Sequence, residues 1–332
     1  MANLLEVNDL HVSFFTYAGE VHAVRGVTWY LKEKETIAIV GESGCGKTVT
    51  IQTSIGLLQS PPGKVLSGEV LFNGDDILKY SPAKIRSIQG NGMSMVFQDP
   101  LTYLNPTKKV GDQIAEAYLQ HHKGKKKEAR ELVLKMMRMV SLPDPEENME
   151  RYPHQLSGGM RQRVMVAMAL IGSPKILFAD EPTTALDVTI QAQIIDLMND
   201  LKEKIDTSIV LITHDLGVVA EMAERIYVMY AGQIVEHADA DTLFENPQHP
   251  YTQGLLKSSP RLDAENKSEL ATIPGTPPDL LAPPKGCAFA ARCPHAMNIC
   301  ARLQPGYTGF EEEGHYAACW LFAAGAKGGR HA

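Results

Sequence analysis

The chain has 332 residues, room for one large domain or a domain with appendages, and 44% of them are hydrophobic, enough for a substantial core. Its formal net charge of −7 argues against a surface that coats nucleic acid. The first residues lack a basic start followed by an apolar run, and no apolar stretch approaches the roughly 18 residues that span a bilayer. We therefore expect neither a signal peptide nor a membrane span.

The first part of the chain predicts a β-rich region followed by a strand, loop and helix. Alternating polarity predicts a half-exposed strand over residues 4–13, with residues 24–31 as its antiparallel partner. Residues 36–40 predict a short buried strand that runs into a glycine-rich loop, and residues 48–58 a helix. Residues 68–74, which end in Asn-Gly, indicate a hairpin.

The middle of the chain changes from strand to helix and back. Residues 93–97 predict a buried strand, and residues 110–140 and 152–171 have a helical period. Two short apolar strands follow, at residues 176–179 and 209–213. Alternating strands and helices imply a mostly parallel sheet covered on both faces, interrupted by a helical insertion.

The last part predicts a change of character. A helix over residues 190–205 lies between the two preceding strands, and residues 225–236 suggest a terminal strand pair. The composition shifts after residue 246. Residues 273–285 are rich in proline, so we expect them to be extended rather than helical.

A phosphate-binding loop is the first chemical signal. Gly41-x-x-x-x-Gly46-Lys47-Thr48 fits the P-loop pattern, with a predicted strand before it and a helix after it. Glycines let backbone N–H groups converge on phosphate oxygens, and the helix directs its positive end at the same anion. We expect Lys47 to contact the β- and γ-phosphates of ATP and Thr48 to ligate Mg²⁺. The remaining nucleotide-binding candidates of this loop are Ser43, Gly44 and Cys45.

Two carboxylates close the strand predicted at residues 176–179. Asp180 is the candidate to hold Mg²⁺, directly or through water, and Glu181 has the position of the carboxylate that polarises the attacking water. A lone Asp-Glu pair at a strand end is often merely solvated. The P-loop upstream favours the catalytic interpretation.

The heptad at residues 156–162, Leu-Ser-Gly-Gly-Met-Arg-Gln, narrows the function further. Together with the P-loop and Asp180-Glu181, in that order, it resembles the ATP-binding-cassette (ABC) ATPases. The resemblance implies an α/β, RecA-like P-loop NTPase fold: a mostly parallel sheet with an antiparallel β subdomain, an α-helical insertion subdomain and a small C-terminal extension. It also implies that Ser157, Gly158 and Gly159 cap the ATP of an opposing subunit.

The same resemblance assigns further residues. His214 would contact the γ-phosphate, and Gln98 would link Mg²⁺ and water to a transmembrane partner. Asp187, in Thr184-Ala-Leu-Asp187, matches a loop that crosses the dimer interface. Tyr17 lies about where an aromatic ring stacks on adenine; Phe14 and Phe15 compete for that role, or any of the three belongs to the core.

Four cysteines cluster late in the sequence, at Cys287, Cys293, Cys300 and Cys319. Without an export signal, disulfides are the less favoured use. The tight pairs typical of structural zinc sites are missing. The spacing leaves an iron–sulfur cluster, zinc and no metal all open.

A narrower resemblance covers nearly the whole chain. Residues 246–255, 274–278, 286–287 and 292–294, together with residues 99–106, look like the ATPase subunits of oligopeptide/dipeptide permeases. Some members carry a [4Fe–4S] cluster on the corresponding cysteines, so this resemblance favours such a cluster here, with zinc as the alternative.

Two departures from the family pattern stand out. Cys45 replaces a common serine, and its thiolate is expected to be favoured beside Lys47 and the helix N-terminus. Tyr103 stands where a small polar residue is usual, which bears on contact with the permease.

The resemblance divides the chain into an ATPase core at residues 1–98 and 172–245, a helical subdomain at 99–171 and a C-terminal extension at 246–332. It implies ATP and Mg²⁺, a second ABC ATPase subunit (a copy or a paralogue), two transmembrane permeases, an extracytoplasmic solute-binding protein and no nucleic acid. The chain would lie at the cytoplasmic face of the membrane. The alternatives are the same machine importing nickel or another small solute and, ranked lower, a soluble ABC ATPase in DNA repair or translation.

Overall fold

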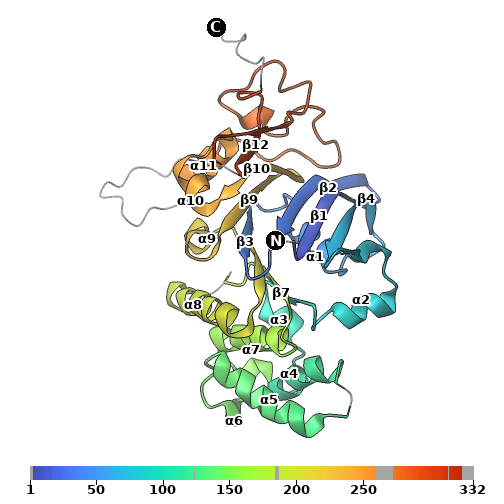
Figure 1. Ribbon diagram of the computed structural model, residues 1–332, viewed down its shortest axis with the longest axis vertical. Helices are drawn as coiled ribbons and strands as arrows, with labels where there is room; N and C mark the ends of the chain where they lie inside the picture. The colour runs from blue at the N-terminus through green and yellow to red at the C-terminus, as the bar shows by residue number, and fades with distance from the viewer. Residues whose placement is uncertain (1–2, 123, 184–186, 259–271, 313, 324–332) are drawn as a thin grey trace, which may run out of the picture. The chain divides into compact units, whose positions relative to one another are not determined.

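The computed structural model describes residues 3–122, 124–183, 187–258, 272–312 and 314–323 (Figure 1). The chain forms two compact units. Unit 1 consists of the described parts of Met1–Leu4, Leu31–Thr36 and Asp76–Ile212, and unit 2 of those of Leu5–Tyr30, Ile37–Asp75 and Thr213–Ala332. Within the described residues, no helix is both long and apolar enough to cross a membrane.

Unit 2 contains an antiparallel sheet near the start of the chain. Strand β1 (Leu5–Thr16) lies between β2 (Gly19–Leu31) and β4 (Gly63–Phe72), and β5 (Asp75–Asp76) follows β4. Asn73 and Gly74 have φ of +51° and +84°, which suits the tight turn of the predicted hairpin.

A β-bulge at Asp9 interrupts the alternation of buried and exposed residues along β1. Leu5 and Val7 are buried, but the next buried positions are Leu10 and Val12, so the period of two is broken once. The register of β1 against β4 shifts between Asn8 and residue 11, and Asp9 has φ of +47°. The extra residue restores the inward direction of the later side chains.

Unit 2 also contains a second, mixed sheet. Its strands lie in the order β11 (Tyr307–Gly309), β12 (Tyr316–Ala318), β10 (Gln233–Asp239), β9 (Arg225–Tyr230) and β3 (Thr36–Val40). Strands β3 and β9 are parallel, whereas the other neighbours are antiparallel. The helices of this unit are α1 (Lys47–Ser54), α9 (Leu216–Met222), α10 (Ala240–Glu245) and α11 (Pro250–Ser258).

Unit 1 combines three parallel strands with the helical insertion. Strand β7 (Ile176–Asp180) lies between β6 (Met93–Val96) and β8 (Ser208–Ile212), and every residue of the three strands is buried. Burial on both faces explains their continuous apolar sequences.

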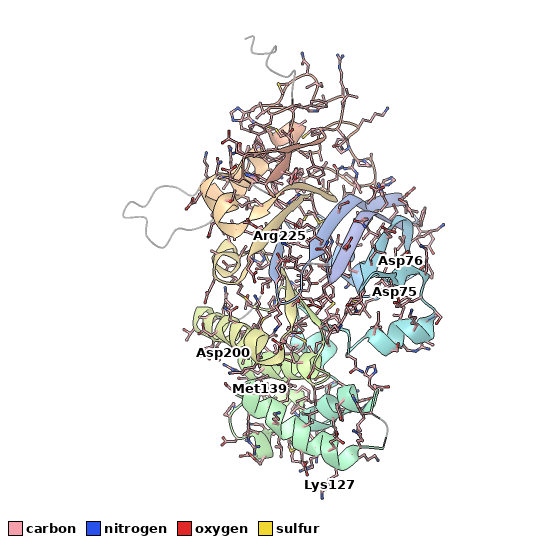
Figure 2. All side chains as sticks on the ribbon, in the orientation of Figure 1. Asp75, Asp76, Lys127, Met139, Asp200 and Arg225 are labelled. Carbon is pink, nitrogen blue, oxygen red and sulfur yellow. The ribbon has the colours of Figure 1, made fainter. Side chains whose placement is uncertain are left out.

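Helices make up the rest of unit 1. Helix α4 packs against α5 and α7, and Figure 2 labels Lys127 and Met139 towards the two ends of α5. The helical elements are η1 (Ile77–Lys79), α2 (Pro82–Ile88), α3 (Pro100–Tyr103), α4 (Val110–Leu119), α5 (Lys126–Met139), α6 (Pro145–Asn148), η2 (Pro153–Gln155), α7 (Gly158–Leu170) and α8 (Val188–Ile205).

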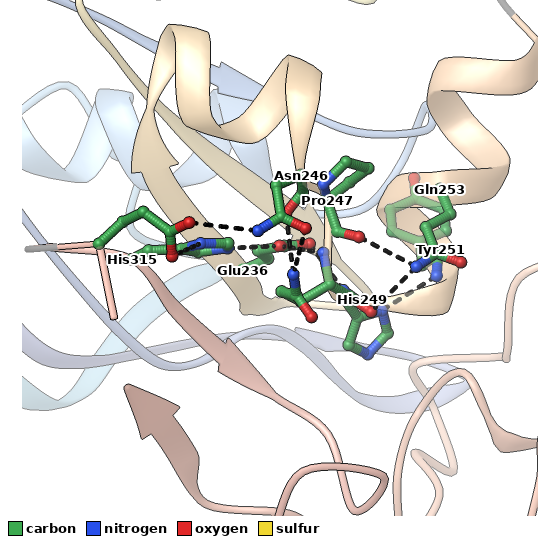
Figure 3. Close-up of polar contacts among 9 residues, drawn as sticks. Glu236, Asn246, Pro247, His249, Tyr251, Gln253 and His315 are labelled. Carbon is green, nitrogen blue, oxygen red and sulfur yellow. Dashed lines mark hydrogen bonds and ion pairs between the residues drawn. The ribbon is translucent and has the colours of Figure 1, made fainter. Parts of the chain in front are cut away.

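The buried carboxylate of Glu236 binds the described residues from 246 onward, here called the C-terminal segment (Figure 3). Glu236 of β10 is fully buried and accepts hydrogen bonds from the backbone N–H of Gln248 at 2.6 Å, the backbone N–H of His249 at 2.9 Å and His315 Nε2 at 2.8 Å. His249 Nδ1 in turn accepts from the backbone N–H of Tyr251 at 3.0 Å, which caps the first turn of α11 after Pro250.

Most predicted elements are present, with two differences. Helix α1 ends at Ser54 rather than near residue 58, because Gly56 adopts φ of +72°. Beyond the predicted strand pair β9 and β10, the sheet continues with the antiparallel strands β12 and β11, which were not predicted. The proline-rich residues 273–285 form neither helix nor strand, as predicted. The division into core, helical subdomain and extension stays a prediction.

Candidate nucleotide and cysteine sites

The glycines of the P-loop are required by close backbone packing. Strand β3 ends at Val40, and a side-chain Cβ built on Gly41 would lie 2.1 Å from the carbonyl oxygen of Met229. On Gly46, which has φ of +103°, it would lie 2.4 Å from the carbonyl oxygen of Ala23. Only glycine fits at these two positions, so the loop keeps the path in which successive N–H groups line an anion site.

Lys47 lies across this loop. Its side chain is 5% exposed, and Nζ donates hydrogen bonds to the carbonyl oxygens of Gly41 at 2.7 Å and Glu42 at 2.9 Å. Helix α1 starts at Lys47 and has no side-chain cap at Gly46, while Ser43, Gly44 and Thr48 are exposed. The exposed residues and the uncapped helix start suit phosphate and Mg²⁺ binding.

The surroundings of Cys45 differ from those expected for a thiolate. Its side chain is 5% exposed, and burial raises the pKa of its thiol. Lys47 Nζ lies 3.9 Å from Sγ and acts in the opposite direction, but burial is the larger effect. The prediction that a thiolate is favoured here was therefore wrong, and Cys45 is a buried thiol.

The other two nucleotide candidates of unit 2 are exposed. His214 is exposed and precedes Asp215, which caps α9 by accepting from the Gly217 N–H at 2.9 Å. Tyr17 is fully exposed in the turn between β1 and β2, whereas Phe15 is half exposed. Tyr17 is therefore not a core residue, and its ring is accessible for stacking.

Unit 1 brings Gln98 and Glu181 together. Strands β6 and β7 are parallel neighbours, so the residues that follow them emerge at the same edge of the sheet. Gln98 Nε2 donates to Glu181 Oε2 at 2.8 Å. Asp180 is 6% exposed, and Glu181 has φ of +47°, with its N–H donated to the Ile212 carbonyl oxygen. A left-handed non-glycine residue at this edge is the kind of strain that accompanies functional sites.

The heptad starts helix α7. Ser157 is exposed and its Oγ accepts from the Met160 N–H at 3.3 Å, and Gly158 is exposed beside it. A Cβ on Gly159 would lie 2.8 Å from Cγ2 of Ile190 in α8, so glycine is needed for the contact between α7 and α8. Buried apolar side chains hold this helix in the protein, among them Val164, Val166 and Ala167.

Asp187 caps helix α8. Its Oδ1 accepts from the Ile190 N–H at 3.0 Å. The preceding residues of the expected interface loop, 184–186, lie outside the described residues.

The four cysteines lie within electrostatic range of one another. Burial raises the pKa of Cys319 to about 12, with added repulsion from the other three sulfurs. Burial likewise raises the pKa of Cys287 and Cys293. The Cys287 N–H donates to the Cys300 carbonyl oxygen at 2.7 Å.

Backbone donors approach two of the sulfurs. The N–H of His295 donates to Cys293 Sγ at 3.4 Å, and that of Met297 to Cys300 Sγ at 3.4 Å. Such hydrogen bonds are typical of thiolate ligands. Across the described residues, however, no group of three or more histidine, cysteine or acidic side chains is arranged to hold a metal ion.

Sequence patterns did not predict two contacts that Glu42 of the P-loop makes with distant residues. The Glu42 carboxylate accepts from Nη1 and Nη2 of Arg292 at 2.6 and 2.8 Å, and the Glu42 N–H donates to the Tyr251 hydroxyl at 2.9 Å. Arg292 and Tyr251 follow Glu42 by 250 and 209 positions. No local pattern connects residues so far apart.

Known families match two regions of the chain. Residues 24–184 match the family described as ABC transporter, and residues 235–300 match the one described as oligopeptide/dipeptide transporter, C-terminal region. The second region includes Tyr251, Arg292 and three of the four cysteines.

Relatives match nearly the whole chain. The dipeptide transport ATP-binding protein DppD of Bacillus subtilis is 56% identical over 97% of this chain and 95% of its own length. The oligopeptide transport ATP-binding protein OppD of the same organism is 53% identical over 97% and 89%. The OppD protein of Salmonella typhimurium is 50% identical over 91% and 89%.

Solved structures confirm the fold class. The ATP-binding cassette MJ0796, in a dimeric structure bound to ADP and Pi, is 26% identical with a TM-score of 0.64, over 71% of this chain and 98% of its own. The protein cbiO1 of Clostridium perfringens, part of the ABC transporter complex cbiONQ, is 27% identical with a TM-score of 0.63, over 74% and 92%.

Proposed function

The chain belongs to the oligopeptide/dipeptide family of ABC transporter ATP-binding proteins, and from this premise we propose that it hydrolyses ATP to drive the uptake of di- or oligopeptides through partner permeases. The observation that carries the peptide assignment is the match of residues 235–300, because the family matched there is described as oligopeptide/dipeptide transporter, whereas residues 24–184 match the broader family described as ABC transporter.

We assign the nucleotide chemistry as follows. Lys47 binds the β- and γ-phosphates, and Thr48, Gln98 and Asp180 serve Mg²⁺. Glu181 polarises the attacking water, and the hydrogen bond from Gln98 supports this role because it fixes the direction of the carboxylate. His214 contacts the γ-phosphate and Tyr17 stacks on adenine; their exposure supports both roles. The loop residues Gly41, Ser43, Gly44, Cys45 and Gly46 supply backbone donors.

Ser157, Gly158 and Gly159 are proposed to cap the ATP of a second ATPase subunit, with Asp187 at the same interface. The exposed start of α7 supports this, since its N–H groups are accessible to an anion. ATP then joins the two subunits, and hydrolysis removes the bridging γ-phosphate. The partner is a second copy or a paralogue.

Two permeases and an extracytoplasmic solute-binding protein complete the proposed machine, with this chain on the cytoplasmic face of the membrane. The exposed side chains of Leu101 and Tyr103 support a permease contact just after Gln98. Tyr103 stacks on Phe97 with 3.9 Å between ring centroids, so the unusual tyrosine is held in place rather than loose.

We further propose that Cys287, Cys293, Cys300 and Cys319 hold a [4Fe–4S] cluster. Their mutual proximity and the N–H donors to two sulfurs support cluster ligation. Zinc held by the same four thiolates is the alternative. When bound, the cluster would cross-link the C-terminal segment.

Iron and acid-labile sulfide analysis of anaerobically purified protein tests the cluster. We expect about four irons per chain, and their loss in Cys293→Ser. One zinc per chain without iron would refute the cluster.

Uptake of a radiolabelled dipeptide by cells lacking this chain tests the transport proposal. Uptake should be lost and should return with the wild-type chain but not with Glu181→Gln. Normal peptide uptake together with lost nickel uptake would overturn the peptide assignment and support the metal-importing alternative.

A further inference from the structure

The P-loop residue Glu42 is held by groups from the C-terminal segment. Its carboxylate receives both Nη atoms of Arg292, and its N–H is bound by the Tyr251 hydroxyl. Its carbonyl oxygen receives Lys47 Nζ. The backbone and side chain of one loop residue are thus tied to the C-terminal segment on one side and to the phosphate-binding lysine on the other.

The Arg292 side chain is buried and fully hydrogen-bonded. Its side chain is 5% exposed, and all five of its N–H donors have acceptors. Apart from the two Glu42 oxygens, these acceptors are the Pro274 carbonyl oxygen at 2.9 Å, the Ile273 carbonyl oxygen at 3.2 Å and the Tyr230 hydroxyl at 3.2 Å. The hydrogen bonds to Glu42 raise the pKa of Arg292, which stays charged. A buried, fully satisfied guanidinium has one orientation.

An aromatic group supports the second contact. Tyr251 is fully buried, and its ring lies 4.6 Å from that of Tyr230 and 5.4 Å from that of Phe289. Burial raises the pKa of its hydroxyl, which therefore stays protonated. Because the ring of Tyr251 is packed between other aromatic rings, its hydroxyl is a fixed acceptor for the Glu42 N–H.

The charge of Glu42 poses a problem for the site. The loop binds a polyanion, and a carboxylate within it repels phosphates over roughly 10 Å at moderate ionic strength. Arg292 is the cation that offsets this charge in unit 2, at 2.6 Å. Without it, the uncompensated carboxylate would oppose ATP binding.

We propose that Arg292 and Tyr251 are positioning residues for the phosphate-binding loop: Arg292 neutralises the Glu42 carboxylate, and the Tyr251 hydroxyl holds the loop backbone at the Glu42 N–H. The C-terminal segment is thereby part of the nucleotide site. This inference rests on the proposed role of Gly41–Thr48 as the phosphate-binding loop.

A mutant cycle on the full-length chain tests this, with the dissociation constant of Mg-ATP measured by a fluorescent ATP analogue. Arg292→Met should weaken binding roughly tenfold, as expected for residues of one hydrogen-bond network. The defect should shrink at high salt, because salt screens the exposed repulsion. Glu42→Gln should bind no more weakly than the wild type.

The rescue distinguishes the proposal from a general structural role. Adding Glu42→Gln to Arg292→Met should return affinity to within about threefold of the wild type, since the repelling charge is gone. Steady-state ATPase assays should show a raised KM with kcat nearly kept. A double variant as weak as Arg292→Met, or a lowered kcat with an unchanged KM, would overturn the proposal.

Three controls complete the test. Arg302→Met removes an exposed arginine of the same segment and should leave affinity unchanged. Arg292→Lys keeps the charge but loses the two parallel hydrogen bonds, so its affinity should lie between those of the wild type and Arg292→Met. Should the methionine variant not fold, Arg292→Gln replaces it in the cycle, and an Arg292→Gln variant that binds as well as Arg302→Met overturns the proposal. Lys47→Ala must abolish ATP binding. If it does not, the assignment of the phosphate-binding loop fails, which is a different result from failure of the Arg292 cycle.

Discussion

Gln98 and Glu181 are joined by a 2.8 Å hydrogen bond from the glutamine amide to the carboxylate, at the edge where β6 and β7 end. The amide donates and the carboxylate accepts, so the contact fixes the direction of the Glu181 carboxylate. A carboxylate held in one direction is what water polarisation requires.

We expect Glu181→Gln to bind ATP normally and to lose at least about a hundredfold in kcat, because an amide cannot accept the proton of the attacking water. Binding of a fluorescent ATP analogue and phosphate release measure the two effects. Glu131→Gln, on the exposed face of α5, is the matched control and should leave both unchanged. Normal turnover in Glu181→Gln would contradict the role of Glu181.

Ser157→Ala should act on the partner's nucleotide rather than on its own. The exposed Oγ caps α7 and is proposed to face the opposing ATP, so ATP affinity at low protein concentration should stay within about twofold while ATP-induced dimer formation weakens roughly tenfold. Light scattering or sedimentation measures the dimer. A loss of ATP affinity in the monomer would show that Ser157 serves the cis site instead.

Glu236→Gln should destabilise the C-terminal segment. The fully buried Glu236 carboxylate accepts three hydrogen bonds. A glutamine amide would replace one accepting oxygen by an NH₂ group, which would point at an N–H donor and could not bind it. We expect a loss of about 2–4 kcal/mol in the free energy of unfolding, measured by denaturant titration. The exposed Glu245→Gln is the control and should change it by less than about 0.5 kcal/mol. Equal stability of the two variants would contradict the anchoring role of Glu236.

Acid should destabilise the protein through His249. Burial lowers its pKa to about 3, from 6.5, so the folded state holds it neutral. A lowered histidine pKa means that the unfolded state binds the proton more readily: stability is full above pH 6.5 and falls by roughly 1.4 kcal/mol per unit as the pH drops towards 3. His249→Asn keeps an acceptor for the Tyr251 N–H but does not titrate, so unfolding curves from pH 6.5 to 4.5 should be flatter by that amount. An unchanged slope would contradict this assignment.

Local patterns predicted most of the fold and of the proposed site. The P-loop, the strand ending at Asp180 and the start of α7 are short, continuous signals set by backbone chemistry. Strands β11 and β12 were missed because three residues are too few for a period, and the bulge at Asp9 because its only trace is one break in alternation.

Long-range packing accounts for the remaining errors. The thiolate expected at Cys45 was wrong because the sequence shows the neighbouring lysine but not the burial. The contact of Glu42 with Arg292 was invisible for a similar reason: each residue looks like an ordinary charged residue until the fold brings them together.

Because Arg292 follows Glu42 by 250 positions, the ribosome synthesises the phosphate-binding loop well before the arginine that neutralises it. A ribosome adding 5 to 20 residues per second makes the loop roughly 12 to 50 seconds before its arginine partner. During that interval, and in any chain broken off before Arg292, the loop carries an unbalanced negative charge. Incomplete chains should therefore bind ATP poorly. Because ATP is proposed to join the two subunits, an incomplete chain would then not dimerise with a complete one.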